Sequence, residues 1–381
     1  MCRKAGAARR RADEVRVLAA AGGSGGHCYP AIAFLQACRK RHPDWTLTLA
    51  VDRGVKTLGL EVEAAAAHSI REVESAGFAG LKSLLDFRFW GKLIRGSRQA
   101  KALLKSAAPD LVIGFGGYGS FPVVWEAESA GVPVILHEQN AVMGLANRVL
   151  AIRAKKLAVS LPLKRLPSGA RREQVIQTGF PLRSTLRRLD AAAVRGRFGL
   201  DPAKKTLLVF GGSQGSKFIN GLMDTLIKDH GDVLKANWQI LHLTGRASSD
   251  ALEGHDTVTG PFRRWTYSRE MDALYTAADL VACRAGSATL HELSYYGKPS
   301  ILIPYPYAHG HQVENARVLA DGGAAWLSEE KNTTPASFAA ILNEAAADAS
   351  KLVRMAQRSS GLLKTDGASA LVDLAECLAA R

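Results

Sequence analysis

The sequence predicts an α/β protein in which two similar domains, each built on a doubly wound parallel sheet, face each other across a cleft. An apolar strand, a glycine-rich loop and a helix follow one another from Val15 and again from Lys204, roughly 190 residues later. Thr178–Arg183 breaks the pattern between them, which indicates an interdomain linker. A chain of 381 residues suits two domains of roughly 100 to 200 residues each.

The composition is that of a globular protein, with 47% hydrophobic and 22% charged residues. A formal charge of +15 favours anionic partners, which include nucleic acid, acidic lipid and phosphorylated substrates. The five cysteines are scattered, with no Cys-x-x-Cys pair, which argues against a disulfide framework or a zinc site and for a reducing compartment. No apolar run approaches the roughly 18 to 20 residues that span a bilayer.

The basic N-terminus imitates a secretion signal. The apolar run that follows is short, contains Arg16 and continues directly into a glycine loop, so we reject that interpretation. Residues 1–12 are predicted to be a disordered basic extension.

The first cycle consists of a strand at Val15–Ala21, the loop Gly22–His27 and a helix predicted to begin at Pro30. The dinucleotide fingerprint fails, because Cys28 stands where its third glycine should be. His27 lies at the mouth of this loop. It is either a structural histidine or, beside an anion-binding loop, a general base.

Further along the chain, Phe78–Lys105 mixes aromatic and aliphatic residues with lysines and arginines. The pattern fits either a patch resting on an anionic membrane or a core-packed helix with a solvated basic face. A strand at Val132–Leu136 then ends in His137–Asn140, and so dense a polar group after a buried strand indicates a site.

The stretch Leu280–Gln312 is predicted to contain a strand, a glycine turn, a helix opening near Thr289, a second strand at Pro299–Pro304 and a polar loop. In an open parallel sheet such turns face the ligand crevice. Glu292 in the first helical turn suits the hydroxyls of a ribose, but it would equally complement the positive end of its own helix.

Seven motifs occur in a characteristic order: Gly22–His27 with Pro30, Gly114–Pro122, His137–Asn140, Thr178–Arg183, Gly211–Gly215, Cys283–Glu292 and His311–Ala316. Together they resemble the MurG family of membrane-associated glycosyltransferases of peptidoglycan synthesis, glycosyltransferase family 28. The resemblance runs from about Val15 to the C-terminus.

This resemblance implies the GT-B architecture of two facing Rossmann-like domains. Residues 13–180 would receive the lipid acceptor and contact the membrane, residues 181–355 would bind UDP-GlcNAc, and residues 356–381 would form a helix that packs back on the N-terminal domain. The implied reaction transfers GlcNAc from UDP-GlcNAc, with inversion, to the C4 hydroxyl of MurNAc in lipid I, forming lipid II for cell-wall biogenesis, cell shape and division.

The resemblance also implies roles for individual residues. His27 would be the catalytic base, with the His137–Asn140 group as the alternative. Glu292 would hold the ribose and Gln312 the sugar, with Ser213 and Arg183 near the diphosphate. The implied donor-binding residues are Ser24, Gly25, Gly26, Asn140, Arg183, Ser213, Ser268, Ser287, Ala288, Thr289, Leu290, His291, Glu292 and Gln312.

The implied partners are UDP-GlcNAc, undecaprenyl-linked lipid I, an anionic membrane surface and other cell-wall synthesis proteins, with no nucleic acid. No cofactor or metal is implied, and the sequence has no Asp-x-Asp metal clamp. The expected location is the cytoplasmic face of the inner membrane, as a peripheral protein. In the family the region of Phe78–Lys105 and nearby aromatics, here Trp125, form an apolar patch with a basic rim, so the membrane interpretation of this region is now favoured.

Three positions depart from the family pattern. Phe180 stands where the family usually has Asn, Ser24 replaces Thr, and Gly310 lies in a loop that is more often acidic.

The alternative functions are a glycolipid glucosyltransferase or a UDP-GlcNAc 2-epimerase on the same fold. A nucleic-acid-binding protein ranks last, because no motif that reads RNA or DNA is present.

Overall fold

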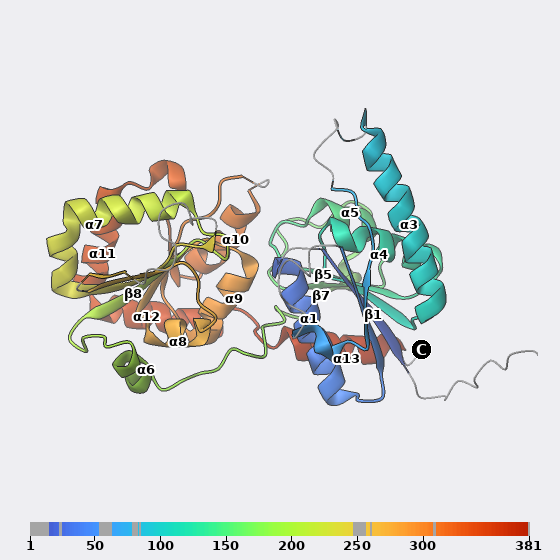
Figure 1. The fold of residues 1–381 in the computed structure, drawn as a ribbon, viewed down its shortest axis with the longest axis horizontal. Coiled ribbons are helices and arrows are strands. Elements are labelled where there is room, and N and C mark those ends of the chain that lie inside the picture. Colours follow the sequence, from blue (N-terminus) through green and yellow to red (C-terminus); the bar gives the residue numbers. More distant parts are fainter. Residues whose placement is uncertain are drawn as a thin grey trace, which may run out of the picture.

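The computed structural model describes residues 15–22, 25–52, 63–77, 83, 85–246, 257–259, 261–307 and 310–379. These residues form two seven-stranded sheets, one in each of two domains. The domains lie next to each other, with the C-terminal domain at the left of Figure 1 and the N-terminal domain at the right.

The N-terminal sheet has the strand order β3-β2-β1-β4-β5-β6-β7, and all of its paired strands are parallel. The order reverses between β1 and β4, so the carboxyl ends of these two strands border a crevice. The strands are β1 (Arg16–Ala21), β2 (Thr46–Val51), β3 (Ser69–Glu72), β4 (Leu111–Gly114), β5 (Val134–Glu138), β6 (Lys156–Val159) and β7 (Val175–Gln177). The helices are α1 (Gly25–Arg41), α3 (Phe87–Ala107), α4 (Phe121–Ser129) and α5 (Leu145–Leu150).

The C-terminal sheet repeats this plan with the order β10-β11-β9-β8-β12-β13-β14, in which β10 alone runs antiparallel to its neighbour. Its switch point lies between β8 and β12. The strands are β8 (Lys205–Phe210), β9 (Trp238–Leu243), β10 (Thr257–Thr259), β11 (Phe262–Trp265), β12 (Leu280–Cys283), β13 (Ser300–Leu302) and β14 (Ala325–Leu327). The helices are α6 (Ala191–Arg197), α7 (Lys217–Asn237), α8 (Met271–Ala277), α9 (Ser287–Tyr296), α10 (His311–Asp321), α11 (Pro335–Ala347) and α12 (Ala349–Ser359).

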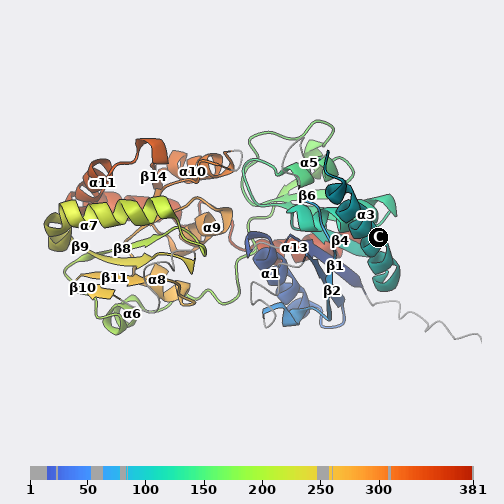
Figure 2. The same cartoon turned by 45° about the horizontal axis from the view of Figure 1, so that its top comes forward.

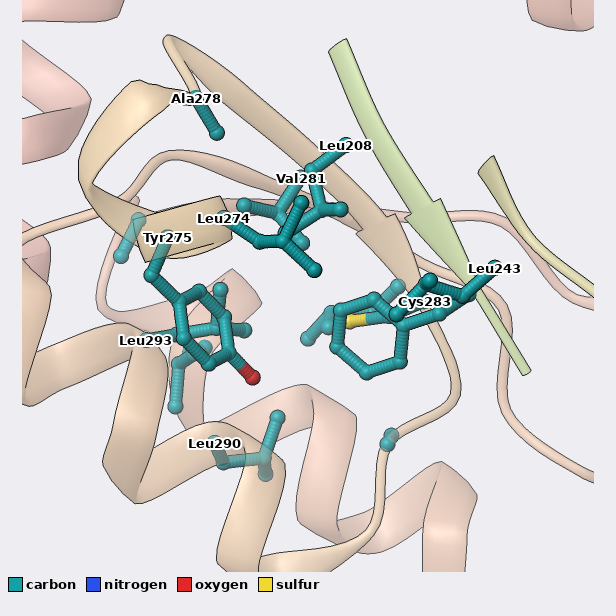
Figure 3. Packing of buried hydrophobic residues seen from close by; sticks show 14 of the residues in the cluster. Leu208, Leu243, Leu274, Tyr275, Ala278, Val281, Cys283, Leu290 and Leu293 are labelled. Atoms are coloured by element: carbon teal, nitrogen blue, oxygen red, sulfur yellow. The ribbon is translucent and has the colours of Figure 1, made fainter. Parts of the chain in front are cut away.

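One core of the C-terminal domain lies between α8, α9 and the sheet. Figure 3 shows Tyr275 of α8 and Leu290 and Leu293 of α9 converging on Leu208 and Cys283 from the strands. Leu290 is fully buried, and burying such a side chain contributes about 1.5–3 kcal/mol. This packing fixes the position of α9, whose N-terminus faces the N-terminal domain.

The chain crosses between the domains twice, and the two crossings touch. Pro181 forms a β-bridge with Asp366. Gly179 has φ +86°, and a Cβ at this position would lie 2.3 Å from the carbonyl oxygen of Lys364. Only glycine therefore fits at this contact.

After the second crossing, α13 (Gly367–Ala379) packs on α1 of the N-terminal domain, as Figure 2 shows. Leu371 and Val372 join the same buried cluster as Val17 and Phe34. Arg41 of α1 also pairs with Asp373. The end of the chain is thus part of the N-terminal core.

Several predicted boundaries were wrong. Helix α9 begins at Ser287 and not near Thr289, so Glu292 lies in its second turn and not in its first. Helix α1 begins at Gly25 and not at Pro30, which lies in its second turn and leaves one intrahelical hydrogen bond unmade. Strand β5 continues through His137 and Glu138, because these residues pair with Ala158 and Val159 of β6. The polar group therefore begins inside the sheet and not after it.

Candidate active site

A pocket of about 700 Å³ lies where the two domains meet. Its N-terminal wall comes from the segments after β1, β4 and β5, which include His27, Gly116 and Asn140. Its C-terminal wall includes Gly286 before α9 and Gln312 of α10. The carboxyl ends of both sheets therefore border one cavity, as expected for ligand sites in open α/β sheets.

The loops after β1 and β4 are packed against each other through glycines. The Gly22 N–H donates to the carbonyl of Gly116 at 3.0 Å. A Cβ on Gly22 would lie 3.0 Å from the Cα of Gly117. Side chains at these positions would push the loops apart, so the glycines bring the start of α1 against the end of β4.

His27 lies in the first turn of α1 and lines the pocket. Its Nδ1 is 3.0 Å from the carbonyl oxygen of Phe115, which also accepts from the Gln139 side-chain amide at 3.2 Å. A carbonyl can only accept, so Nδ1 carries the proton and Nε2 holds the lone pair. No described residue makes a hydrogen bond to Nε2.

Electrostatics keep this imidazole neutral. Burial lowers the pKa of His27 below its ordinary value of 6.5, although the Phe115 hydrogen bond and the charges of Glu138 and Asp52 act in the opposite direction. A neutral ring whose Nε2 is unprotonated can accept a proton from a substrate hydroxyl.

The residues of the His137–Asn140 group differ in burial. His137 is completely buried, and its Nε2 lies 2.9 Å from Ser160 Oγ. Burial lowers the pKa of His137 to about 3. His137 borders the pocket with a fully buried side chain, whereas His27, in the same pocket, is half-buried. Asn140 is the member of the group that is not buried.

Glu138 organises the loop that follows β5. Its carboxylate accepts from the backbone N–H groups of Asn140 at 3.0 Å and Gly144 at 3.1 Å. It also accepts from the side-chain amide of Asn147 at 2.9 Å. These bonds fix the loop on the N-terminal side of the pocket.

Four helix N-termini border the pocket: those of α1, α5, α9 and α10. Gly286 and Gly310, the N-cap residues of α9 and α10, make no side-chain cap. The first turns of α1 and α9 contain no acidic residue. Uncapped N–H groups and the positive helix ends make this an environment for an anion such as a diphosphate.

Glu292 lies on α9 and is 7% exposed. One carboxylate oxygen accepts from Arg183 Nη2 at 2.8 Å, and the other accepts from the Tyr275 hydroxyl at 2.8 Å. Burial and the Glu292 charge raise the pKa of Tyr275, so its hydroxyl remains a donor. A carboxylate has about four acceptor positions, of which these contacts occupy two, but Glu292 is not among the residues that line the pocket.

The other residues predicted to bind the donor substrate differ in burial and in position relative to the pocket. Leu290 and His291 have fully buried side chains, so only their backbone could meet a ligand. Ala288 and Thr289 are half-buried in the first turn of α9, as is Gly25 in α1, whereas Gly26 and Ser213 are exposed. Ser268 follows β11, does not line the pocket, and its Oγ accepts from Glu270 N–H at 3.0 Å. Ser24 lies outside the described residues.

Gln312 lines the pocket and connects two loops of the C-terminal domain. Its Oε1 accepts from Ala285 N–H at 3.2 Å and from Tyr305 N–H at 3.0 Å. Its Nε2 has no hydrogen-bond partner among the described residues and so remains available to a sugar.

Phe180 is buried at the junction between the domains. Its ring stacks on His291 at 5.3 Å and lies 6.2 Å from the ring of His137. Phe180 therefore fills the space between β5 and α9 and contributes no polar group to the pocket.

Sequence reasoning missed Tyr275, and it placed Gln139 and Arg284 in predicted motifs without giving either one its supporting role. Arg284 donates to the carbonyl of Ile303 at 3.1 Å and to Ser216 Oγ at 2.6 Å, and pairs with Glu330 at 2.5 Å. It thus connects the glycine loop after β8 to the end of β13. Its position next to a predicted strand end was the only sequence signal for this role.

Two facing Rossmann-like domains with a shared cleft define the class of GT-B glycosyltransferases and related sugar-nucleotide enzymes. Two family models match the chain: the glycosyltransferase family 28 N-terminal domain over residues 17–159 and its C-terminal domain over residues 206–372. The protein belongs to glycosyltransferase family 28.

A relative from Desulforamulus reducens is 34% identical over 377 residues, which cover 96% of this chain and 98% of the relative. It is named UDP-N-acetylglucosamine–N-acetylmuramyl-(pentapeptide) pyrophosphoryl-undecaprenol N-acetylglucosamine transferase. Acinetobacter baumannii MurG shares the fold, with a TM-score of 0.70 and 24% identity over 94% of this chain and 98% of that one. A UDP-N-acetylglucosamine 2-epimerase described as putative, from Listeria monocytogenes, also shares it, with a TM-score of 0.67 and 12% identity over 96% of each chain.

Proposed function

We propose that the protein transfers GlcNAc from UDP-GlcNAc to the C4 hydroxyl of MurNAc in undecaprenyl-linked lipid I, with inversion, forming lipid II. The observation that carries this proposal is the shared pocket, in which His27 of one domain and the N-termini of α9 and α10 of the other face the same cavity. The relatives' names supply the substrates.

The donor would lie on the C-terminal side of the pocket. The uncapped N-termini of α9 and α10 would bind the diphosphate, and their partial positive charge would stabilise UDP as it leaves. Glu292 would accept from the ribose hydroxyls while Arg183 and Tyr275 hold its carboxylate. Gln312 Nε2 would donate to the sugar.

The acceptor would approach from the N-terminal side. His27 Nε2 would take the proton of the attacking C4 hydroxyl, which forms the new bond to the anomeric carbon as the bond to UDP breaks. The Nδ1–H stays hydrogen-bonded to the carbonyl of Phe115, so Nε2 is the nitrogen left to accept the proton.

The lipid and the membrane would contact α3 and α5. Leu85, Phe87, Trp90 and Ile94 are 89%, 79%, 46% and 50% exposed at the start of α3, and the buried residues of this helix all lie from Gly96 onward. Figure 1 shows this end of α3 standing out from the domain. The predicted segment 78–82 before the helix lies outside the described residues.

An apolar groove of about 260 Å³ between α3, α4 and α5 supports this arrangement. It shares Tyr118, Leu145 and Ala146 with the active-site pocket. Arg88, Lys92 and Arg98 are exposed on α3, which suits an anionic surface. Among the described residues, no helix combines the length and apolar character needed to cross a bilayer.

The function is tested with labelled UDP-GlcNAc and a lipid I analogue, with UDP-glucose as the competing donor. We expect UDP release only when the lipid I analogue is present, and labelled lipid II as the product. Conversion of UDP-GlcNAc without an acceptor would instead establish an epimerase, which the shared fold also accommodates. Preference for UDP-glucose would indicate a glycolipid glucosyltransferase.

A vesicle assay tests the membrane contact. Phe87→Ser with Trp90→Ser should reduce binding to vesicles that contain anionic lipid, because both side chains are exposed and apolar. Val353→Ser, at an exposed position of α12 in the other domain, is the matched control. Equal binding by all three proteins would refute a membrane role for α3.

A further inference from the structure

Asn315 is a completely buried residue of α10, and its side-chain amide joins segments of both domains. Its Oδ1 accepts from the backbone N–H of Ala141 at 2.9 Å. Its Nδ2 donates to Asn140 Oδ1 at 3.0 Å and to the carbonyl of Ala285 at 3.2 Å. One amide therefore connects the loop after β5 of the N-terminal domain to the turn after β12 of the C-terminal domain.

These bonds occupy the side chain of Asn140. Its Oδ1 accepts from Asn315, and its Nδ2 lies 3.3 Å from Glu138 Oε1. Glu138 also holds the Asn140 backbone N–H at 3.0 Å. Asn140 is therefore committed to the contact between the domains before any ligand binds.

A second hydrogen bond crosses the cleft beside this one. Ser287 Oγ, at the first position of α9, donates to the carbonyl of Gln139 at 2.5 Å. The side-chain amide of Gln139 donates to the carbonyl of Phe115 at 3.2 Å, and the same carbonyl accepts from His27 Nδ1. The N-terminus of α9 is thus connected, through Gln139 and the carbonyl of Phe115, to the histidine on the opposite wall.

We propose that Asn315 is a positioning residue that sets the distance between the donor-binding turn before α9 and the loop that holds the catalytic His27. The inference rests on the proposed function for the identity of donor and base. Asn315 touches neither substrate. It acts through Asn140, Ala141 and Ala285, and a small displacement of reacting groups costs up to about 10²-fold in rate.

The sharpest variant is Asn315→Asp, which keeps the shape and the acceptor for Ala141. It replaces the donor Nδ2 by an oxygen that faces two acceptors, Asn140 Oδ1 and the carbonyl of Ala285. We expect kcat to fall about 10- to 100-fold while KM for UDP-GlcNAc changes less than about threefold. Asn315→Gln, one methylene too long to restore all three bonds, should recover activity only partly.

The matched control is Lys164→Met. Lys164 makes another interdomain contact with α10, an ion pair to Glu314 at 2.7 Å, one residue before Asn315. The lysine side chain is 57% exposed, so this pair contributes little. Its loss should leave kcat within about twofold of the wild type. A reduction as large as that of Asn315→Asp would refute a specific role for the amide.

Amide hydrogen exchange provides a readout without substrate. In the wild type the Ala141 N–H should be protected by Asn315 Oδ1, and Asn315→Ala should raise its exchange rate by about tenfold or more, because the acceptor is gone. Unchanged exchange there would overturn the contact itself. This measurement also applies if Asn315→Asp is too unstable to assay.

A double-mutant cycle completes the test. Asn140→Ala and Asn315→Ala should each lower kcat/KM, and the double variant should be little worse than either single one, because both remove the same contact. Additive losses would refute action through Asn140. An inactive wild type would refute the proposed function, whereas an active wild type with a fully active Asn315→Asp would refute the positioning role alone.

Discussion

The two glycine loops, after β1 and after β8, share a sequence pattern but have different surroundings. The first is packed against the glycines after β4 and leads to His27, whose Nδ1 is held by Phe115. In the second, Gly212, Ser213 and Gln214 are exposed, and Ser216 is held by Arg284 at 2.6 Å. The first loop presents a titratable side chain, whereas the second presents backbone N–H groups.

This difference shows that neighbouring segments decide what a glycine loop does. In the first turn of α1, behind the loop after β1, His27 is half-buried, and burial lowers its pKa. The loop after β8 also packs against another loop, because a Cβ on Gly215 would lie 2.0 Å from the carbonyl oxygen of Thr244. Its residues Gly212 to Gln214 nevertheless stay exposed to solvent. The comparison fits the proposed division, in which one domain would transfer the proton and the other would bind the diphosphate.

The largest effect is expected at the first loop. His27→Ala should lower kcat about 10²- to 10⁴-fold, because general-base catalysis contributes this much, and should change KM for UDP-GlcNAc far less. His27→Gln can still donate an N–H to Phe115 but cannot accept the proton, so it should be similarly impaired. Steady-state kinetics with a lipid I analogue decide the matter. Nearly normal turnover in either variant would remove His27 from the mechanism.

The support of the second loop should matter for stability. Arg284→Met removes a buried guanidinium that holds Ser216, Ile303 and Glu330, and should lower the free energy of unfolding by about 3 kcal/mol. Denaturant unfolding measures this loss. Arg264→Met, which removes a more exposed ion pair to Asp224, is the control and should lose less than about 1 kcal/mol. Similar losses would show that Arg284 does not support the loop.

Variants of Glu292 test whether the C-terminal domain also uses a side chain to bind the donor. Glu292→Ala should raise KM for UDP-GlcNAc about 10- to 150-fold, because hydrogen bonds to a charged group are worth about 1.5–3 kcal/mol. Tyr275→Phe, which removes one of the bonds that hold the carboxylate, should have a smaller effect. Calorimetric titration with UDP measures the donor affinity directly. If that affinity is unchanged in Glu292→Ala, the carboxylate does not bind the ribose.

The pH dependence of kcat/KM tests whether His27 is the group that accepts the proton of the acceptor hydroxyl. The folded-state pKa of His27 is lowered, so the ring is neutral at pH 7 and becomes protonated only as the pH falls below the ordinary value of 6.5. Protonation blocks Nε2, so kcat/KM should decline on the acid side, by about tenfold per pH unit below that pKa. A pH profile of the residual activity of His27→Gln should lack this limb. Persistence of the limb would assign it to another group.

The smallest effect is expected at Ser213. If the second loop acts through its backbone, Ser213→Ala removes at most one hydrogen bond, worth about 0.5–1.5 kcal/mol, and should raise KM for UDP-GlcNAc about two- to tenfold. Ser213→Gly keeps the loop backbone and should behave alike. A loss comparable with that of His27→Ala would mean that the second loop also works through a side chain.

The fold class could be predicted because strands and glycine loops are local patterns. Each half of the chain displays its own strand, loop and helix, and parallel sheets then place the loops at one edge. Boundaries were less predictable. His137 reads as a loop residue by its polarity, but it belongs to β5, where the partner strand β6 determines its environment.

The candidate site was predictable where a residue opens the helix that follows a strand and its loop, and not where a distant partner defines its surroundings. His27 and Gln312 lie in the first turns of such helices, and both line the pocket. The restraint of Glu292 by Tyr275, 17 positions earlier, and of Asn140 by Asn315, 175 positions later, depends on how helices pack. No local pattern contains that information, which is why the supporting residues emerged only from the structure.

The docking of α13 onto α1 has a consequence for how the chain matures during synthesis. Leu371, Val372 and Ala375 belong to the same core as β1, so the first domain to leave the ribosome lacks part of its interior until the last residues emerge. The C-terminal domain, encoded in between, can complete its own core earlier. The N-terminal domain should therefore be the more aggregation-prone part of the nascent chain until α13 has emerged.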